Sequence, residues 1–193
     1  MRDDVQQVVR LQAPPRYEQW PVALRSAMQL RGALVACGPG VRGVAWPDSQ
    51  SIRLASLRPW LTEQLIATQL TAAWGWGAAR HPGRPLAFAS LAGHRLKLPP
   101  SAMVRRYELR LKPDDVVRIG GLQVTSRLRT IVDLLHRPGE FTCAERTACQ
   151  LLMCRLPGRA VRVRQQLETP RRPHSRLARS RFVAIHDSTE TAE

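Results

Sequence analysis

The sequence has no long hydrophobic run and no amino-terminal targeting pattern. Its apolar stretches fall well short of the roughly 18 residues that a membrane-spanning helix requires. The first residues, Met1-Arg2-Asp3-Asp4, lack the charged-then-apolar order of a secretory signal. Hydrophobic residues make up 44% of the 193 positions, which is typical of a globular protein with its own core. We therefore expect a cytoplasmic protein with no membrane segment.

Residues that perform catalysis or bind metals are few and scattered. The five histidines include no pair four residues apart, and no G-x-S-x-G turn presents a serine nucleophile. In a cytoplasmic chain, thiols stay reduced and behave as small hydrophobes, so we expect free cysteines. The cysteines show no paired C-x-x-C spacing; they are Cys37, Cys143, Cys149 and Cys154. The sequence predicts no enzyme activity, no metal and no cofactor.

Acidic residues are scarce relative to basic ones. There are 15 Asp and Glu against 30 Lys and Arg, which gives a net charge of +15 and a pI near 11.4. A field of this sign attracts a polyanion. Only Lys97 and Lys112 are lysines, and GC-rich arginine codons explain part of that bias. The charge fits duplex DNA, and it fits the acidic surface of a toxin protein equally well.

Residues 1–50 have the pattern of a small winged-helix-like part. A helix is predicted over 22–30, because Pro21 can occupy its first turn and Gly32 can end it. Two strands, 33–36 and 41–46, are predicted around a glycine turn. A short helix is also possible around 5–11. A complete module usually has three helices before the hairpin, so this one is reduced.

Three arginines surround the predicted helix and turn. Arg25 and Arg31 flank the helix, and Arg42 follows the turn Gly38-Pro39-Gly40. Because wing arginines reach phosphates or the minor groove, we predict that all three bind DNA, with ordinary solvated surface as the alternative. The run Gly38 to Gly43 also matches G-x-G-x-x-G, but a nucleotide-binding loop must be followed by a helix. The strand predicted here favours a wing turn.

Residues 51–156 are predicted to form a mixed domain of helices and antiparallel strands. Periodicity and turn residues define the elements. The glycine pair 120–121 predicts a hairpin, while Ser126 and the box Thr142–Glu145 predict helix caps. The expected elements are a helix over 60–79, strands within 86–88, 107–111, 116–119 and 122–124, and helices over 126–136 and 143–152. With the winged-helix-like part, the fold class is α+β.

Residues 157–193 are predicted to be a basic helical segment followed by a disordered acidic tail. Between residues 155 and 181 there are nine arginines against a single acid, Glu168. No aromatic residue precedes Phe182 there, which argues against a base-stacking surface. Phosphate attraction or an acidic protein partner fits the segment better.

Two segments carry a family resemblance. Residues 121–135 read GLQVTSRLRTIVDLL, and residues 66–77 read IATQLTAAWGWG. Together they resemble the AbiEi-type antitoxin and transcriptional-regulator family of type IV toxin–antitoxin systems, over roughly residues 30–180. The resemblance implies two activities: neutralising a nucleotidyltransferase-like toxin, and repressing the operon through the N-terminal domain.

The same segments have plain structural interpretations. Arg129 and Asp133 are spaced to pair along a helix, and Thr130 can fix the preceding strand end. Trp74 and Trp76 are expected to pack in the core, where they would supply much of the buried surface in a chain with few aromatics. Fragments of a metal-nuclease motif, including Asp114 and Asp115, occur in the wrong order and in a turn.

Three hypotheses follow from these patterns. The first is a DNA-binding transcriptional regulator and antitoxin. The second is an antitoxin that acts by protein interaction without binding DNA. The third, which the sequence supports least, is a nuclease-related protein.

Overall fold

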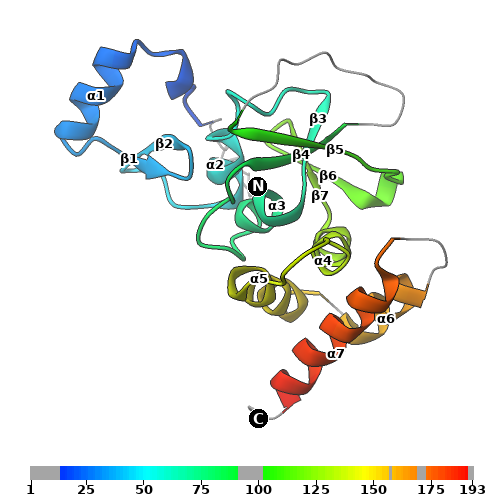
Figure 1. The fold of residues 1–193 in the computed structure, drawn as a ribbon. Coiled ribbons are helices and arrows are strands. Elements are labelled where there is room, and N and C mark those ends of the chain that lie inside the picture. Colours follow the sequence, from blue (N-terminus) through cyan, green and yellow to red (C-terminus); the bar gives the residue numbers. More distant parts are fainter. Residues whose placement is uncertain (1–13, 91–101, 157, 169–172, 191–193) are drawn as a thin grey trace, which may run out of the picture.

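The protein has an α+β fold, as the sequence predicts (Figure 1). The computed structural model describes residues 14–90, 102–156, 158–168 and 173–190, so the helix considered around 5–11 lies outside it. The N-terminal elements are η1 (Tyr17–Gln19), α1 (Val22–Leu30), β1 (Leu34–Cys37) and β2 (Gly40–Gly43). The remaining elements are α2 (Gln50–Ala55), β3 (Leu65–Ala67), α3 (Gln69–Gly75), β4 (Leu86–Ser90), β5 (Val104–Glu108), η2 (Pro113–Asp115), β6 (Val116–Ile119), β7 (Leu122–Thr125), α4 (Arg127–Leu135), α5 (Cys143–Cys154), α6 (Arg159–Glu168) and α7 (Ser175–Glu190).

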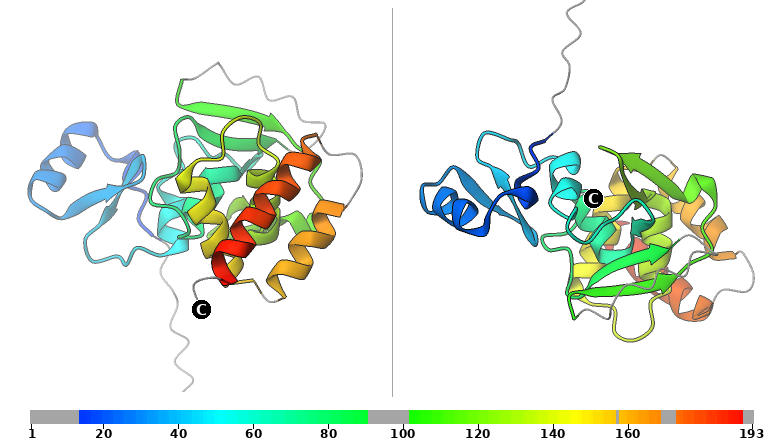
Figure 2. Two further views of the ribbon diagram at one scale, coloured as in Figure 1. Left: turned by 60° about the horizontal axis from the view of Figure 1, so that its bottom comes forward. Right: turned by 90° about the horizontal axis from the view of Figure 1, so that it is seen from above.

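Residues 14–43, which we call the N-terminal module, project from one side of the molecule (Figures 1 and 2). Helix α1 begins after Pro21 and ends before Gly32, which takes a φ of +72°. Strands β1 and β2 then pair antiparallel, with Leu34 opposite Gly43 and Cys37 opposite Gly40. The predicted helix and hairpin are therefore confirmed, although the second strand ends at Gly43 and does not reach residue 46.

The body is built on a five-stranded mixed sheet with the strand order β5-β4-β3-β7-β6. Strand β3 lies in the middle, antiparallel to β4 and parallel to β7. Strands β4 and β5 are parallel, and β6 and β7 form the predicted hairpin through Gly120 and Gly121, both at positive φ. No helix within the described part of the chain combines the length and apolar character needed to cross a membrane.

Helices cover one side of this sheet (Figure 1). Helix α3 contacts β4 and β7 and also α4 and α5, while α6 and α7 pack on α4 and α5. The centre of the core is apolar and closed to water; it includes Leu65, Phe88, Ile131, Leu134, Val163 and Ile185. Burial of such side chains contributes about 1.5–3 kcal/mol each.

One predicted helix is wrong. Residues 65–67 of the expected 60–79 helix form the central strand β3, and α3 begins only at Gln69. All three residues of β3 are buried, so they form a continuous apolar run without the alternation that marks a half-exposed strand. Similarly, β5 covers 104–108, so the alternating residues 109–111 extend beyond its end.

The C-terminal region is more structured than predicted. Helix α7 runs to Glu190, although the last dozen residues read as a disordered tail. Phe182 and Ile185 are buried in the same core as Leu65 and Cys37. Apolar residues spaced along α7 anchor the helix to the core. The acidic residues that follow them in the sequence led to the prediction of a disordered tail. The domain boundaries at 50 and 156 stay predictions.

Candidate nucleic-acid interface

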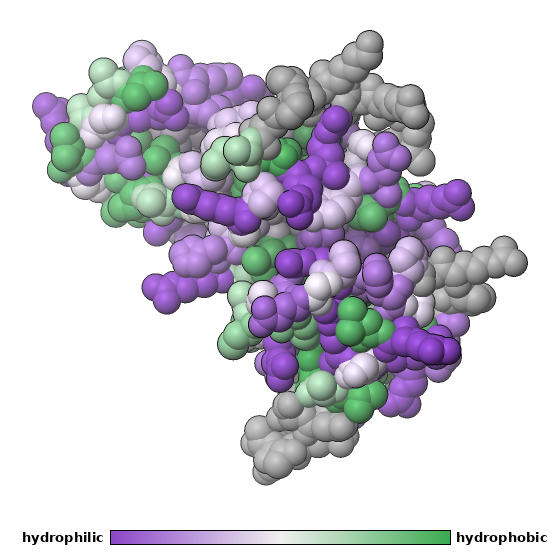
Figure 3. Space-filling view, in the orientation of Figure 1, coloured by the Kyte–Doolittle hydropathy of each residue, from purple (hydrophilic) through white to green (hydrophobic). Residues whose placement is uncertain are grey.

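Helix α1 lies almost entirely in solvent. None of its nine residues is buried, and among the helices and strands it packs mainly on β1. Ser26 and Gln29 are exposed. So are three large apolar residues, Val22 at 69%, Leu24 at 44% and Leu30 at 91%. Figure 3 shows hydrophobic and hydrophilic groups mixed over this end of the molecule. The helix thus offers polar side chains and an uncovered apolar surface together.

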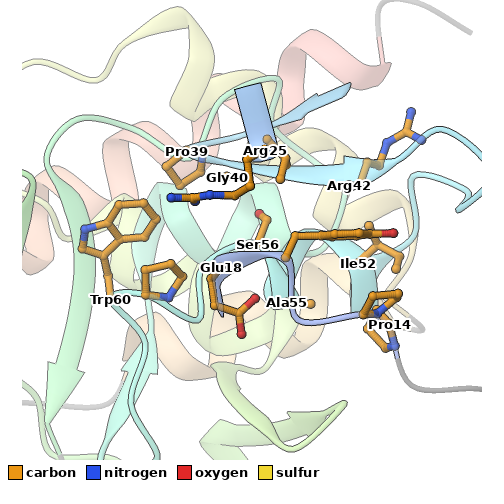
Figure 4. A pocket seen from close by; sticks show the side chains of 14 residues that line it. Pro14, Glu18, Arg25, Pro39, Gly40, Arg42, Ile52, Ala55, Ser56 and Trp60 are labelled. Atoms are coloured by element: carbon orange, nitrogen blue, oxygen red, sulfur yellow. The ribbon is translucent and has the colours of Figure 1, made fainter. Parts of the chain in front are cut away.

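The three arginines predicted to bind DNA have different surroundings. Arg31, the C-cap of α1, is exposed. Arg25 borders a small cavity between the module and the body. Arg42 borders the same cavity, but its guanidinium turns away (Figure 4) and donates to the carbonyl of Trp46 at 2.6 Å. Arg31 therefore presents its charge to solvent, whereas Arg42 already holds a backbone group.

The hairpin turn packs against the body. A Cβ at Gly38 would lie 2.5 Å from the ring of Trp74, and one at Gly40 would lie 2.7 Å from the carbonyl oxygen of Ser56. Glycine is needed at both positions because of these close approaches. Strand β2 follows the turn, so the helix required by the nucleotide-loop alternative does not occur.

An ion pair fixes the body beside the hairpin. Arg53 in α2 bonds both carboxylate oxygens of Asp48, at 2.8 and 2.7 Å, and donates to the carbonyls of Trp74 and Ala79. The hydrogen bond from Arg53 lowers the pKa of the Asp48 carboxyl. Burial raises the pKa of the nearby Cys37 thiol. The sequence offers no signal for Arg53, because its carbonyl partners lie more than twenty residues away.

The two segments with a family resemblance meet in the core. The indole N–H of Trp76 donates to the carbonyl of Thr125 at 2.8 Å. The guanidinium of Arg127 lies 4.5 Å from the centre of the Trp76 ring. The hydroxyl of Thr130 lies 2.8 Å from that of Thr125, which confirms its predicted structural role. Trp76 is only 7% exposed, so it packs in the core as expected.

A buried ionic network runs through the same region. Arg129 binds Asp133 through Nε at 2.8 Å and Asp115 through Nη1 at 2.8 Å. The other oxygen of Asp133 accepts from the hydroxyl of Thr68 at 3.3 Å. Asp115 also accepts from the backbone N–H of Lys112, so it holds the turn before β6. The predicted Arg129–Asp133 pair is confirmed, and it lies in the interior rather than on a solvated face.

A second buried cluster fastens α7 to the rest of the body. Arg181 donates to the carbonyls of Leu135, the last residue of α4, and of Arg137 and Gly139 just beyond it. Desolvation lowers the pKa of this guanidinium. Glu145, only 1% exposed, completes the predicted capping box of α5 and pairs with Arg137. These groups bond to one another, so they have a structural role.

The outer surface of α5, α6 and α7 is basic. Its arginines are exposed and form no ion pair with another residue in the described ranges; they are Arg146, Arg155, Arg162, Arg164, Arg176 and Arg179. Arg162 and Arg164 are on α6, while Arg176 and Arg179 are on α7. Unpaired guanidinium groups of this kind attract phosphate without reading sequence.

No group of three or more His, Cys, Asp or Glu side chains that could hold a metal occurs among the residues with described structure. The nuclease fragment does not form such a group, since Asp115 is bound by Arg129 and by the turn.

Comparisons with known proteins give little further information. No family model matches the chain, and no curated protein matches it. Among solved structures, the RV2827C protein from Mycobacterium tuberculosis aligns with a TM-score of 0.49 and 18% sequence identity. The alignment covers 86% of this chain and 64% of that protein, so this chain spans less than two thirds of its length.

Proposed function

We propose that the chain is a cytoplasmic DNA-binding regulator of the antitoxin type. It would repress its operon by binding duplex DNA and would neutralise a nucleotidyltransferase-like toxin. The placement of α1 carries the DNA-binding half: the helix comes directly before a hairpin, projects from the body and buries no residue. The resemblance of residues 66–77 and 121–135 supports the toxin half.

Within this proposal, α1 is the helix that enters the major groove. Side chains of arginine, glutamine and serine read base edges there. Ser26, Gln29 and Arg31 are the exposed polar residues on or at the end of α1. We propose that Arg31, rather than Arg42, contacts phosphate directly, because the Arg42 guanidinium already donates to the Trp46 carbonyl. The basic surface of α5–α7 would add affinity for any sequence.

One observation favours the second candidate, an antitoxin that acts by protein interaction alone. Val22, Leu24 and Leu30 present large apolar groups to solvent on the same short helix. Burial of such side chains beneath a partner protein would be favourable. In this alternative α1 contacts a toxin and no DNA is bound.

The test measures binding of the full chain to a duplex from its own upstream region by fluorescence anisotropy. Arg31→Ala should weaken binding and lower the salt slope by about one. Arg118→Ala is the matched control, because Arg118 is an exposed arginine on strand β6. If both variants bind alike, α1 is not the reading helix. If the parent binds no duplex but Leu30→Ser abolishes toxin binding, the second candidate replaces the first.

A further inference from the structure

A small cavity lies at the joint between the N-terminal module and the body (Figure 4). Its volume is about 50 Å³. On one side it is lined by η1, α1 and the hairpin turn, through residues such as Tyr17, Arg25 and Pro39. On the other side are Ser56 at the end of α2 and Trp60. A cavity of this size holds about three to five water molecules, or one small polyatomic ion.

Arg25 is the unusual feature of this cavity. Its Nε is buried and has no hydrogen-bond partner. Within the described ranges, its guanidinium forms no ion pair either. In Figure 4 the side chain extends toward Trp60, past Pro39 and Gly40. The Nε–H, buried in a cavity that proline and indole surfaces also line, has lost its water and gained no partner in the protein. By contrast, Arg42 beside it is satisfied by the Trp46 carbonyl.

We propose that this cavity is a binding site for a small oxyanion, a carboxylate or phosphate group held by Arg25. Two oxygens of a carboxylate or phosphate group match the fork of donors on a guanidinium, and their negative charge is the counter-charge that Arg25 lacks. Glu18 also lines the cavity and is the one acidic residue among the described residues around it. Its carboxylate repels an anion, so it limits the affinity of the site and disfavours larger polyanions.

The position of the site gives it a regulatory role, which rests on the proposed function. Arg25 belongs to α1, the helix proposed to read DNA, while Ser56 and Trp60 belong to the body. An anion in the cavity bridges the two and fixes the angle of α1. By linkage, a ligand that favours one arrangement of α1 changes DNA affinity, and DNA changes the affinity of the ligand by the same factor. The ligand is an effector of the regulator.

The experiment follows thermal unfolding of the full chain in a zwitterionic buffer, without DNA, at an ionic strength held constant with sodium chloride. Sodium phosphate and sodium acetate are titrated separately. We expect one of them to raise the Tm by about 5–10 °C at a hundredfold excess over its Kd, and to raise it further with the logarithm of its concentration. A response to phosphate alone assigns a phosphoryl ligand, and a response to acetate assigns a carboxylate. A rise that both salts give equally and in proportion to concentration, or no rise with either, overturns the proposal.

Two variants test the assignment to Arg25. Arg25→Gln should abolish this ligand-specific shift, while Arg31→Gln, at the exposed C-cap of the same helix, should keep it. An equal shift in Arg25→Gln overturns the proposal. If Arg25→Gln does not fold, Glu18→Gln decides, because removing the opposing carboxylate should lower the Kd several-fold. An unchanged or higher Kd in Glu18→Gln contradicts the site.

A separate measurement tests the regulatory role. Saturating ligand should change the Kd for duplex DNA in the parent and not in Arg25→Gln. If the chain binds no DNA at all, the proposed function fails while the thermal result still stands. If DNA binds but the ligand leaves its Kd unchanged, the effector role is overturned.

Discussion

The indole of Trp76 hydrogen-bonds to the backbone of Thr125, with 2.8 Å between Nε1 and the carbonyl oxygen. These residues are 49 positions apart, one beyond the end of α3 and the other at the end of β7. The bond ties the two segments of family resemblance into one unit. The residues that carry the resemblance therefore pack the body, and the surfaces proposed to bind DNA lie outside these two segments.

Trp76→Phe should lower the free energy of unfolding by about 1–2 kcal/mol, because the phenyl ring cannot donate to the buried carbonyl. The Thr130 hydroxyl still reaches that oxygen at 3.1 Å, which limits the loss. Urea unfolding measures the change. Trp20→Phe is the control, because the Trp20 indole packs edge-on against Tyr17 outside the core. Equal losses in both variants would argue against a specific role for the bond.

The buried ionic network should be intolerant of partial removal. Asp133→Ala leaves Arg129 buried with one carboxylate partner, Asp115. Breaking a buried pair from one side costs about 3–5 kcal/mol. Asp114→Ala, next to the network but exposed, should change stability by less than about 0.5 kcal/mol. Chemical denaturation of both variants makes the comparison, and a small loss for Asp133→Ala would show that the network is dispensable.

Arg42→Ala should destabilise the protein measurably. The sequence predicts a solvent-facing side chain, but Arg42 donates to the Trp46 carbonyl beyond the hairpin. Loss of that bond should cost about 1 kcal/mol, or roughly 2–4 °C in Tm for a chain of this size. Arg31→Ala should leave the Tm unchanged. If Arg42→Ala also binds DNA more weakly, its affinity must be measured well below the lowered Tm to separate the two effects.

The thiols should fall into two classes. Cys143 and Cys154 are exposed, while Cys37 and Cys149 are buried. A thiol reagent should modify the first pair rapidly and the second only after unfolding. Burial raises the pKa of Cys149, so above the unfolded value of about 8.5 the unfolded state releases a proton that the folded state keeps. Stability should therefore fall as the pH rises above that value, and Cys149→Ala should flatten the fall.

DNA binding should depend steeply on salt. Three to six phosphate contacts would give a slope of about −3 to −5 for log affinity against log salt. Arg162→Ala and Arg176→Ala, on the basic surface of α6 and α7, should weaken all sequences alike. Gln29→Ala should instead change the preference among sequences. Binding that does not change between low and physiological salt would contradict an electrostatic interface.

Local signals predicted local structure well. Pro21 and Gly32 mark the ends of α1, and the Ser126 and Thr142 caps occur as expected, with Oγ accepting from the N–H three residues on. These signals depend on backbone chemistry within a few residues. For the same reason, the glycine pair at 120–121 predicted its hairpin correctly.

Contacts between distant parts of the chain determine the features that were not predicted from the sequence. Ile66 lies in a central strand whose partners are more than twenty residues away, so its helical periodicity was coincidental. Leu128 has the apolar spacing of α4 but is only partly buried. Leu134 has no exposed surface, so a substitution at Leu134 would test the packing of the core more directly. The cavity at Arg25 needs three distant segments to meet, and no single stretch of sequence encodes it.

Helix α7 has a consequence for how the protein is made. A ribosome delivers the chain from its amino end, so β3, α3 and α4 emerge while the places of Phe182, Ile185 and Arg181 are still vacant. Until α7 arrives, the carbonyls beyond α4 and the apolar side of α5 stay open to water and to other chains. Nascent chains and prematurely terminated products should therefore be substrates for chaperones and proteases. Only a chain translated through α7 should persist in the cell, which couples the abundance of the protein to complete translation.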